Sequence, residues 1–117
     1  EITMLLERSP HQLSIGEKRK VAIASTLIID PAVLILDEPT SSVDPKAEVK
    51  IFNELVEISK DKLLIFVTQR FSSVRIADKI FVVEGGKIAE TGTHQDLMKL
   101  NKRYAKLYNL QAEGYRL

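Results

Sequence analysis

The apolar run of residues 33–36 (VLIL), followed by Asp37, Glu38 and Pro39, constrains the fold more than any other stretch of the chain. A half-exposed strand alternates polar and apolar residues, whereas a short unbroken run is typical of a strand buried on both faces of a parallel sheet. The carboxyl ends of strands in open α/β sheets face the ligand crevice. The run therefore predicts an α/β fold in which Asp37 and Glu38 lie where a metal ion or a reacting water can bind. An ordinary exit into a loop, with both carboxylates solvated, is the alternative.

Start signals for two helices flank this strand. Ser14 and Glu17 have the spacing of a capping box, which predicts a helix that starts at Ser14 and ends before Pro31. An N-cap acid at Asp44, followed by proline at the first helical position, predicts a second helix to about residue 59 or 60. The expected apolar face of this second helix consists of Val49, Phe52, Leu55 and Val56, and its expected solvated charges are Lys46, Glu48, Lys50 and Glu54.

The rest of the chain predicts another buried strand, a hairpin and a terminal helix. Residues 63–67 (LLIFV) repeat the buried-strand pattern, and residues 71–77 suggest a short helix. Strands are expected at 79–83 and 87–90, joined by a tight turn at Gly85 and Gly86. The last helix is predicted to begin at Thr93 and to include Tyr104 and Tyr108, which are expected in a core or docking surface. The lone histidines His11 and His94 are expected at the surface or in loops.

Composition excludes several classes of function. The 117 residues, 44% of them hydrophobic, are enough for one small globular domain, and the net charge of +1 gives no field that would attract nucleic acid. The absence of cysteine excludes disulfides and thiolate metal sites. No apolar run approaches the roughly 20 residues that a membrane-spanning helix needs. Since the first residue is glutamate and no signal-peptide pattern follows, we expect the sequence to be cut from a longer protein.

Four stretches, taken in order, resemble the motifs of one ATPase family. Residues 13–17 (LSIGE), 33–38 (VLILDE), 41–44 (SSVD) and 66–70 (FVTQR) resemble the signature motif, Walker B strand, D-loop and switch loop of an ATP-binding cassette (ABC) ATPase. Residues 92–95 (GTHQ) and 103–108 (RYAKLY) resemble the exporter branch. The resemblance implies a P-loop NTPase-like parallel sheet flanked by helices. It covers only the carboxyl-terminal part of such a domain over residues 1–117, because no Walker A motif (GxxxxGK[ST]) occurs.

The resemblance also implies a role for each motif residue, with ATP and Mg²⁺ as cofactors. Asp37 would hold Mg²⁺, Glu38 would polarise the attacking water, and Gln69 would occupy the catalytic switch position. Ser14, Gly16 and Glu17 would bind the nucleotide of a second subunit in a head-to-tail dimer, and Asp44 would lie at the dimer seam as a further nucleotide-binding residue. Plain helix capping is the alternative for both Ser14 and Asp44.

Two positions depart from the family pattern. The family has glycine where this chain has Ile15, and a β-branched side chain disfavours positive φ and keeps a phosphate at a greater distance. The family has histidine where this chain has Gln69, which can donate and accept hydrogen bonds but carries no protonic charge. We therefore expect nucleotide binding to be preserved better than turnover.

The resemblance implies the nucleotide-binding domain of an exporter-like ABC transporter, in which ATP hydrolysis drives a substrate across a membrane. Its partners would be a second ABC ATPase domain and a transmembrane domain, with no nucleic acid, and its place would be the cytoplasmic face of the cell membrane. The intact protein would be an ATPase, whereas the isolated chain is expected to be inactive. A non-hydrolysing regulatory cassette and a soluble ABC-type ATPase of DNA repair or translation are the alternatives.

Overall fold

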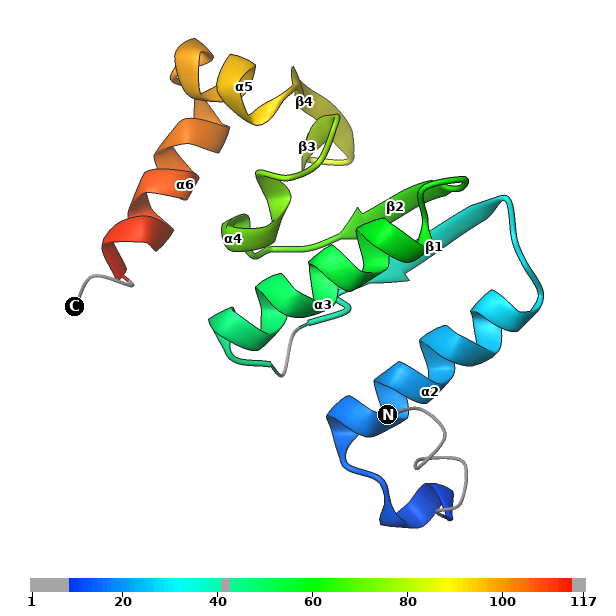
Figure 1. Cartoon of the computed structure of the whole chain (residues 1–117). Coiled ribbons are helices and arrows are strands. Elements are labelled where there is room, and N and C mark those ends of the chain that lie inside the picture. Colours follow the sequence, from blue (N-terminus) through cyan, green and yellow to red (C-terminus); the bar gives the residue numbers. More distant parts are fainter. Residues whose placement is uncertain (1–8, 41–42, 115–117) are drawn as a thin grey trace. The chain divides into compact units, whose positions relative to one another are not determined.

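A computed structural model describes residues 9–40 and 43–114, which form alternating helices and strands (Figure 1). The chain divides into two units, Glu1–Thr68 and Gln69–Leu117, each with its own two-stranded sheet. The described elements of the first unit are η1 (Pro10–Gln12), α2 (Ile15–Ile28), β1 (Val33–Asp37), α3 (Pro45–Ile58) and β2 (Leu63–Val67). Those of the second unit are α4 (Phe71–Val74), β3 (Ile80–Glu84), β4 (Lys87–Gly92), α5 (His94–Leu100) and α6 (Arg103–Gly114).

The sheet of the first unit confirms the predicted parallel α/β arrangement. Strands β1 and β2 pair in parallel, with Val33 opposite Leu63 and Asp37 opposite Val67. Helix α3 connects the two strands and lies along one face of the sheet (Figure 1). The Phe52 and Phe66 rings, 4.7 Å apart between centroids, join the helix to that face. This crossover fixes both strand ends, and therefore Asp37, at one edge of the sheet.

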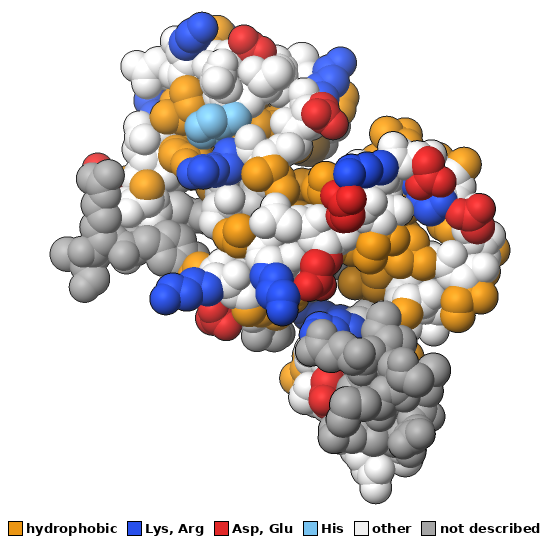
Figure 2. Space-filling model, viewed as in Figure 1, with side chains coloured by type: hydrophobic (Ala, Val, Ile, Leu, Met, Phe, Trp, Pro, Cys, Tyr) orange, Lys and Arg blue, Asp and Glu red, His pale blue; other side chains and the backbone are white. Residues whose placement is uncertain are grey.

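The prediction that β1 and β2 are buried on both faces is wrong for the residues described. Their burial alternates: Leu34 is buried, while Ile35 is 65% exposed and Leu63 is 58% exposed. Only α3 among the described elements of this unit contributes fully buried apolar side chains against the sheet, and α2 has no buried residue. Hydrophobic side chains therefore reach the surface beside β1 (Figure 2).

Helix α3 starts as predicted but buries a different set of side chains. Phe52 and Leu55 are buried, whereas Val49 and Val56 are 47% and 42% exposed. The expectation that Glu48 is solvated is wrong, because its relative exposure is 0%. Residues 48, 52 and 55 follow the i, i+4, i+7 spacing of one helical stripe, so Glu48 extends the buried face of α3 by one turn.

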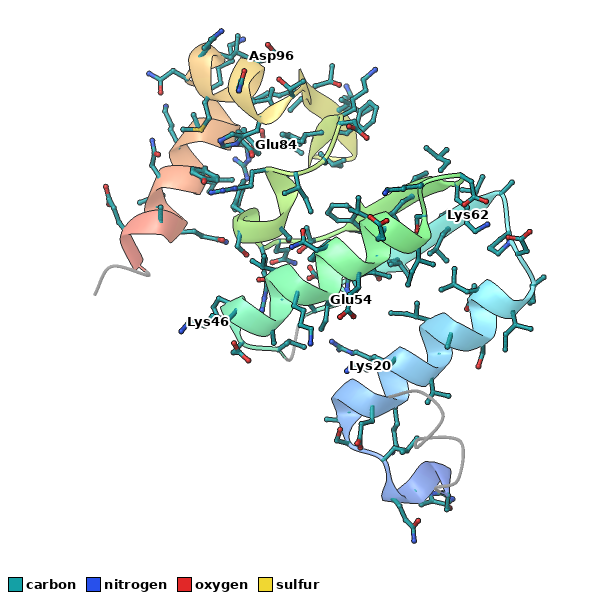
Figure 3. The ribbon with its side chains drawn as sticks, viewed as in Figure 1. Lys20, Lys46, Glu54, Lys62, Glu84 and Asp96 are labelled. Atoms are coloured by element: carbon teal, nitrogen blue, oxygen red, sulfur yellow. The ribbon has the colours of Figure 1, made fainter. Side chains whose placement is uncertain are left out.

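The loop that leads into β2 contains a charged pair. Lys62, which is labelled in Figure 3, donates to the Asp30 carboxylate beyond the end of α2. This hydrogen bond raises the pKa of Lys62 and lowers the pKa of Asp30. Asp30 is also in the left-handed region, with φ 52°, directly before Pro31. The pair therefore ties the sharp turn after α2 to the start of β2.

The second unit contains the predicted hairpin. Strands β3 and β4 are antiparallel, and Gly85 and Gly86 take the positive φ values, 56° and 73°, that the tight turn requires. Ile80, Leu97 and Tyr104 form the buried core of this unit. The hairpin therefore packs with the terminal helices into one hydrophobic cluster.

The prediction of one helix that begins at Thr93 and includes Tyr104 and Tyr108 is wrong. The helix breaks into α5 and α6 at Asn101, which is left-handed with φ 50°, a conformation that asparagine tolerates better than most residues. The buried Glu90 carboxylate on β4 then accepts hydrogen bonds from the Arg103 and Tyr104 N–H groups and caps α6. This cap satisfies backbone donors that a new helix start would otherwise leave unpaired.

His94 is not the loop or surface residue that its isolation in the sequence suggests, whereas His11 is exposed in η1 as expected. The His94 ring is half-buried at the start of α5, and its Nδ1 lies 2.8 Å from the Tyr104 hydroxyl. Burial raises the pKa of Tyr104 to about 12, so this hydroxyl stays protonated and can donate to His94. Tyr104 is buried in the core, as one of its two expected locations.

Candidate functional site

The edge where β1 ends carries the two carboxylates singled out from the sequence. Asp37, the last residue of β1, is exposed opposite Val67. The Glu38 N–H donates to the Val67 carbonyl at 2.8 Å, so the parallel ladder continues one residue past the strand. The Glu38 side chain is half-buried. The structure thus places these two carboxylates, one exposed and one half-buried, on consecutive residues at the carboxyl edge of the sheet.

The backbone of Glu38 is unusual. Its φ of 44° lies in the left-handed region, which is uncommon for a residue with a long side chain. The next residue is proline, which normally favours an extended conformation at the position before it. Such conformations cost on the order of 1–3 kcal/mol and concentrate at active sites and ligand clamps. The turn gives Glu38 a fixed direction at the end of the strand.

A buried hydrogen bond anchors the loop that follows. The Thr40 hydroxyl donates to the Glu48 carboxylate at 2.7 Å, and both side chains have 0% exposure. The Val43 N–H also donates to the Thr40 carbonyl at 3.1 Å. The loop leaving Glu38 is therefore held to α3. Sequence reasoning missed Thr40 and Glu48, although the spacing of Glu48 with Phe52 was a usable signal.

Asp44 lies at the other end of this loop and caps α3. Its carboxylate accepts hydrogen bonds from the Lys46 and Ala47 N–H groups, at 3.0 and 3.1 Å. The capping interpretation of Asp44 is confirmed, and its side chain is exposed. Residues 41 and 42 of the D-loop-like segment lie outside the described residues.

The residues that resemble the signature motif form the start of α2. The Ser14 hydroxyl accepts from the Glu17 N–H at 3.2 Å, and the Glu17 carboxylate accepts from the Ser14 N–H at 2.8 Å, which confirms the capping box. A serine hydroxyl that accepts still has its own proton to donate. Space is open around Gly16, where an added Cβ would meet no heavy atom within 4 Å. This helix start can therefore be approached closely by a ligand.

Ile15 is the first residue of α2, and its side chain is 64% exposed. Because Ile15 lies in the helix and is not among the described residues with positive φ, the objection that a β-branched residue cannot adopt positive φ does not apply. The steric objection remains, since the exposed side chain stands beside the helix N-terminus. Any weakening of this site by Ile15 would come from bulk, not from backbone conformation.

Gln69 belongs to the second unit and follows β2 by two residues. Its side chain is exposed, and its carbonyl accepts a hydrogen bond from the Gln111 side-chain amide at 2.8 Å. Of the candidate residues, the structure brings Asp37 and Glu38 together and ties their loop to the helix that Asp44 caps. Ser14, Gly16 and Glu17 form a separate cluster on α2.

The side chains at the strand end offer carboxylate oxygens, which are ligands that Mg²⁺ prefers. Within residues 9–40 and 43–114 there is no group of three or more histidine, cysteine or acidic side chains that could hold a metal ion. Protein-bound Mg²⁺ commonly uses one or two carboxylates, with water and substrate phosphate oxygens as the other ligands. The exposed Asp37 carboxylate fits such a shared site and does not fit an all-protein cage.

In the part of the chain that is described, no helix is long and apolar enough to cross a membrane.

Comparisons with known proteins agree on one family. A family profile described as ABC transporter matches residues 2–41. Leptomycin B resistance protein pmd1 of Schizosaccharomyces pombe is 43% identical over 99 residues, which is 85% of this chain and 7% of that protein. An ATP-dependent lipid A-core flippase of Mannheimia succiniciproducens is 40% identical over 102 residues, 87% of this chain and 17% of that protein.

A solved structure gives the same result for the fold. The structure of a bacterial Atm1-family ABC exporter with ATP bound superposes with a TM-score of 0.81 at 32% identity, over 95% of this chain and 21% of that one. The chain therefore spans about a fifth or less of the length of these proteins. On the strength of these matches, the chain belongs to the ABC transporter family and is similar to the nucleotide-binding domain of its exporters.

Proposed function

We propose that this chain is the carboxyl-terminal part of an ABC exporter nucleotide-binding domain, which binds and hydrolyses ATP to power transport across a membrane. The observation that carries the proposal is the strand end itself. There, Asp37 is exposed, Glu38 is half-buried on a left-handed turn, and the loop beyond them is anchored through Thr40. Two carboxylates so placed suit phosphoryl transfer to water, which needs charge neutralisation and an oriented water.

Each residue would make a distinct contribution. Asp37 would hold Mg²⁺, which supplies neutralisation of the phosphate charge when it is bound. Glu38 would accept a hydrogen bond from the attacking water and orient it. Gln69 would hydrogen-bond the γ-phosphate through its side-chain amide, which can both donate and accept.

The start of α2 would bind the nucleotide of a second subunit. Ser14 and Gly16 lie at a helix N-terminus, where backbone N–H groups and the helix dipole favour an anion. Glu17 would keep Ser14 in place through the capping box. In the same arrangement Asp44 would lie at the seam of a head-to-tail dimer, which makes a second ABC ATPase domain the first partner.

The second proposed partner is a transmembrane domain, with the cassette at the cytoplasmic face of the membrane. The names of the relatives, a resistance protein, a flippase and an exporter, support transport over the alternative of DNA repair or translation.

A non-hydrolysing regulatory cassette is the second candidate function. Gln69 favours it, because glutamine at the switch position cannot carry the charge of a protonated histidine. The exposed Ile15 side chain beside the α2 N-terminus favours it as well. Such a cassette would still bind ATP and form a dimer with an active partner.

The test uses the intact protein that contains this chain, purified in detergent or reconstituted in vesicles. Glu38→Gln should abolish steady-state phosphate release while ATP binding persists, because the carboxylate that orients the water is lost and the phosphate contacts are not. Asp37→Asn should raise the Mg²⁺ concentration that both ATP binding and turnover require, because a ligand of the ion is lost. Glu54→Gln on exposed α3, labelled in Figure 3, is the matched control and should leave both unchanged. A Glu38→Gln protein with the wild-type rate would exclude the proposal.

A further inference from the structure

Helix α6 presents three side chains to the segment that begins the second unit. Tyr104, Tyr108 and Gln111 follow the i, i+4, i+7 spacing of one helical stripe. The rings of Tyr104 and Tyr108 lie 5.4 and 6.2 Å from the Phe71 ring, between centroids. Gln111 makes two hydrogen bonds to the same segment. The last helix of the chain is therefore docked on residues 69–71.

The two hydrogen bonds of Gln111 form a clamp. Its Nε2 donates to the Gln69 carbonyl at 2.8 Å, and its Oε1 accepts from the Phe71 N–H at 3.1 Å. A backbone carbonyl can only accept and a backbone N–H can only donate, so these partners fix the orientation of the amide without ambiguity. Only glutamine and asparagine carry a donor and an acceptor in this arrangement, and asparagine is one methylene shorter.

Two other contacts hold the residues that follow Gln69. The tyrosine rings contact the Phe71 side chain, and the Ser73 hydroxyl donates to the Arg70 carbonyl at 3.2 Å. The Nε2 bond of Gln111 ends on the carbonyl of Gln69 itself. Since this carbonyl and the Gln69 side chain share one Cα, the bond restricts the backbone rotation that would swing the side chain.

We propose that Gln111 is a positioning residue that holds Gln69 in the direction needed for hydrolysis, so that the docked state of α6 sets the activity of the switch segment. This inference rests on the proposed function for the role of Gln69. It adds that the carboxyl-terminal helix of the chain belongs to the catalytic apparatus through a side-chain clamp on the backbone. A displaced reacting group loses rate, not binding, so the effect belongs in kcat.

The first test asks whether the clamp exists and uses the full 117-residue chain. Amide hydrogen exchange at Phe71, measured by NMR, should be slow in the wild type and faster in Gln111→Ala. In Gln111→Glu the carboxylate can still accept from Phe71 but cannot donate to Gln69, so exchange at Phe71 should stay slow. Exchange at buried Leu97 reports whether the unit remains folded, and Gln95→Ala on α5 is the control. A Phe71 amide that exchanges equally fast in the wild type and Gln111→Ala would overturn the clamp.

The second test measures phosphate release by the intact protein at several ATP concentrations. Gln111→Ala and Gln111→Glu should each lower kcat by about 10- to 100-fold, with KM for ATP within about twofold of the wild type. Gln95→Ala should change neither. A raised KM with unchanged kcat, or no change, would overturn the positioning role. A wild-type protein without any ATPase activity would count against the proposed function instead, and Phe71 exchange would then decide on the clamp by itself.

Discussion

Thr40 and Glu48 illustrate how a single buried hydrogen bond supports the strand end. Both side chains are fully buried, and their 2.7 Å bond joins the loop after Glu38 to α3. A buried polar group that loses its partner costs more free energy than the bond itself contributes, because it was already removed from water. The conformation of the loop therefore depends more on the hydroxyl of Thr40 than on the size of the Thr40 side chain.

Thr40→Val tests this dependence, since valine has nearly the same shape and no hydroxyl. We expect the free energy of unfolding to fall by about 1–3 kcal/mol, because the buried Glu48 carboxylate loses a donor. Urea unfolding followed by circular dichroism measures it. Thr91→Val on exposed β4 is the control and should shift the midpoint little. Equal midpoints for the two variants would mean that the Thr40 bond adds nothing.

Asp96 gives a prediction for pH. Asp96, which is labelled in Figure 3, accepts hydrogen bonds from the Thr93 hydroxyl and N–H at 2.7 and 3.1 Å, and these bonds lower the pKa of Asp96 below its ordinary value of 3.8. The unfolded chain therefore takes up a proton here before the folded chain does as the pH falls. The stabilisation is present above pH 3.8 and is lost as the pH falls through the lowered folded-state pKa.

Asp96→Asn should accordingly be less stable than the wild type near neutral pH, and the difference should shrink as the pH falls below the ordinary pKa of 3.8. Urea unfolding of both proteins across that range supplies the measurement. Asp78→Asn, another exposed aspartate in the second unit, is the control and should show a smaller pH-dependent difference. A difference that stays constant or grows on acidification would contradict the capping role.

At the scale of elements, the described residues of the first unit leave one sheet face uncovered. Five side chains on β1 and β2 that point away from α3 are each at least 42% exposed. They are Val33, Ile35, Leu63, Ile65 and Val67. A contiguous apolar surface of this kind marks an interaction site or an aggregation risk. The face explains why the sequence predicted strands buried on both sides although the described structure covers only one.

The purified chain should therefore self-associate through this face. Sedimentation velocity should show a weight-average mass that rises with concentration, and Ile35→Lys should reduce the rise by placing a charge in the apolar surface. Ile88→Lys on β4 is matched in residue type and exposure, at 62% against 65%, and should leave the association as it is. Association that Ile88→Lys suppresses as strongly as Ile35→Lys would place the contact elsewhere.

Local signals in the sequence predicted the elements well. The capping box at Ser14, the N-cap at Asp44 and the glycine turn at 85–86 depend on residues within three positions of each other, so their patterns are readable from the chain. The break at Asn101 was missed, because its cap comes from Glu90 on another strand. The clamp of Gln111 joins residues 42 positions apart and is equally invisible to local reasoning.

At the scale of the whole molecule, the site lacks a phosphate-binding loop. The sequence contains no GxxxxGK[ST] motif, so the main donors to the β- and γ-phosphates are absent from this chain. The paired charges of Asp37 and Glu38 would repel an unshielded triphosphate. Under the proposed function, this chain would contribute the carboxylates, the switch position and the capped helix, and the phosphate-binding loop would come from outside these 117 residues.

The isolated chain should therefore hydrolyse no ATP and bind Mg-ATP very weakly. Isothermal titration calorimetry of the purified 117 residues would measure the affinity, with magnesium pyrophosphate as a check for unspecific anion binding. Affinity of about 1 µM, equivalent to roughly 8 kcal/mol, with one ATP per chain or per dimer would contradict the requirement for a phosphate loop.

The measurement that tests the central claim most directly is steady-state phosphate release by the intact protein, beside ATP binding, for the wild type, Gln69→His, Glu38→Gln and the double variant. Glutamine at position 69 can donate a hydrogen bond but lacks the charge of a protonated histidine, and loss of a whole donor in a water-excluded site typically costs about 10²–10³ in rate. Gln69→His should therefore raise turnover with little change in ATP affinity, and Glu38→Gln should abolish turnover in both backgrounds. Phosphate release that persists at the wild-type rate in either variant carrying Glu38→Gln would contradict the account, because the strand-end carboxylate would then not orient the attacking water.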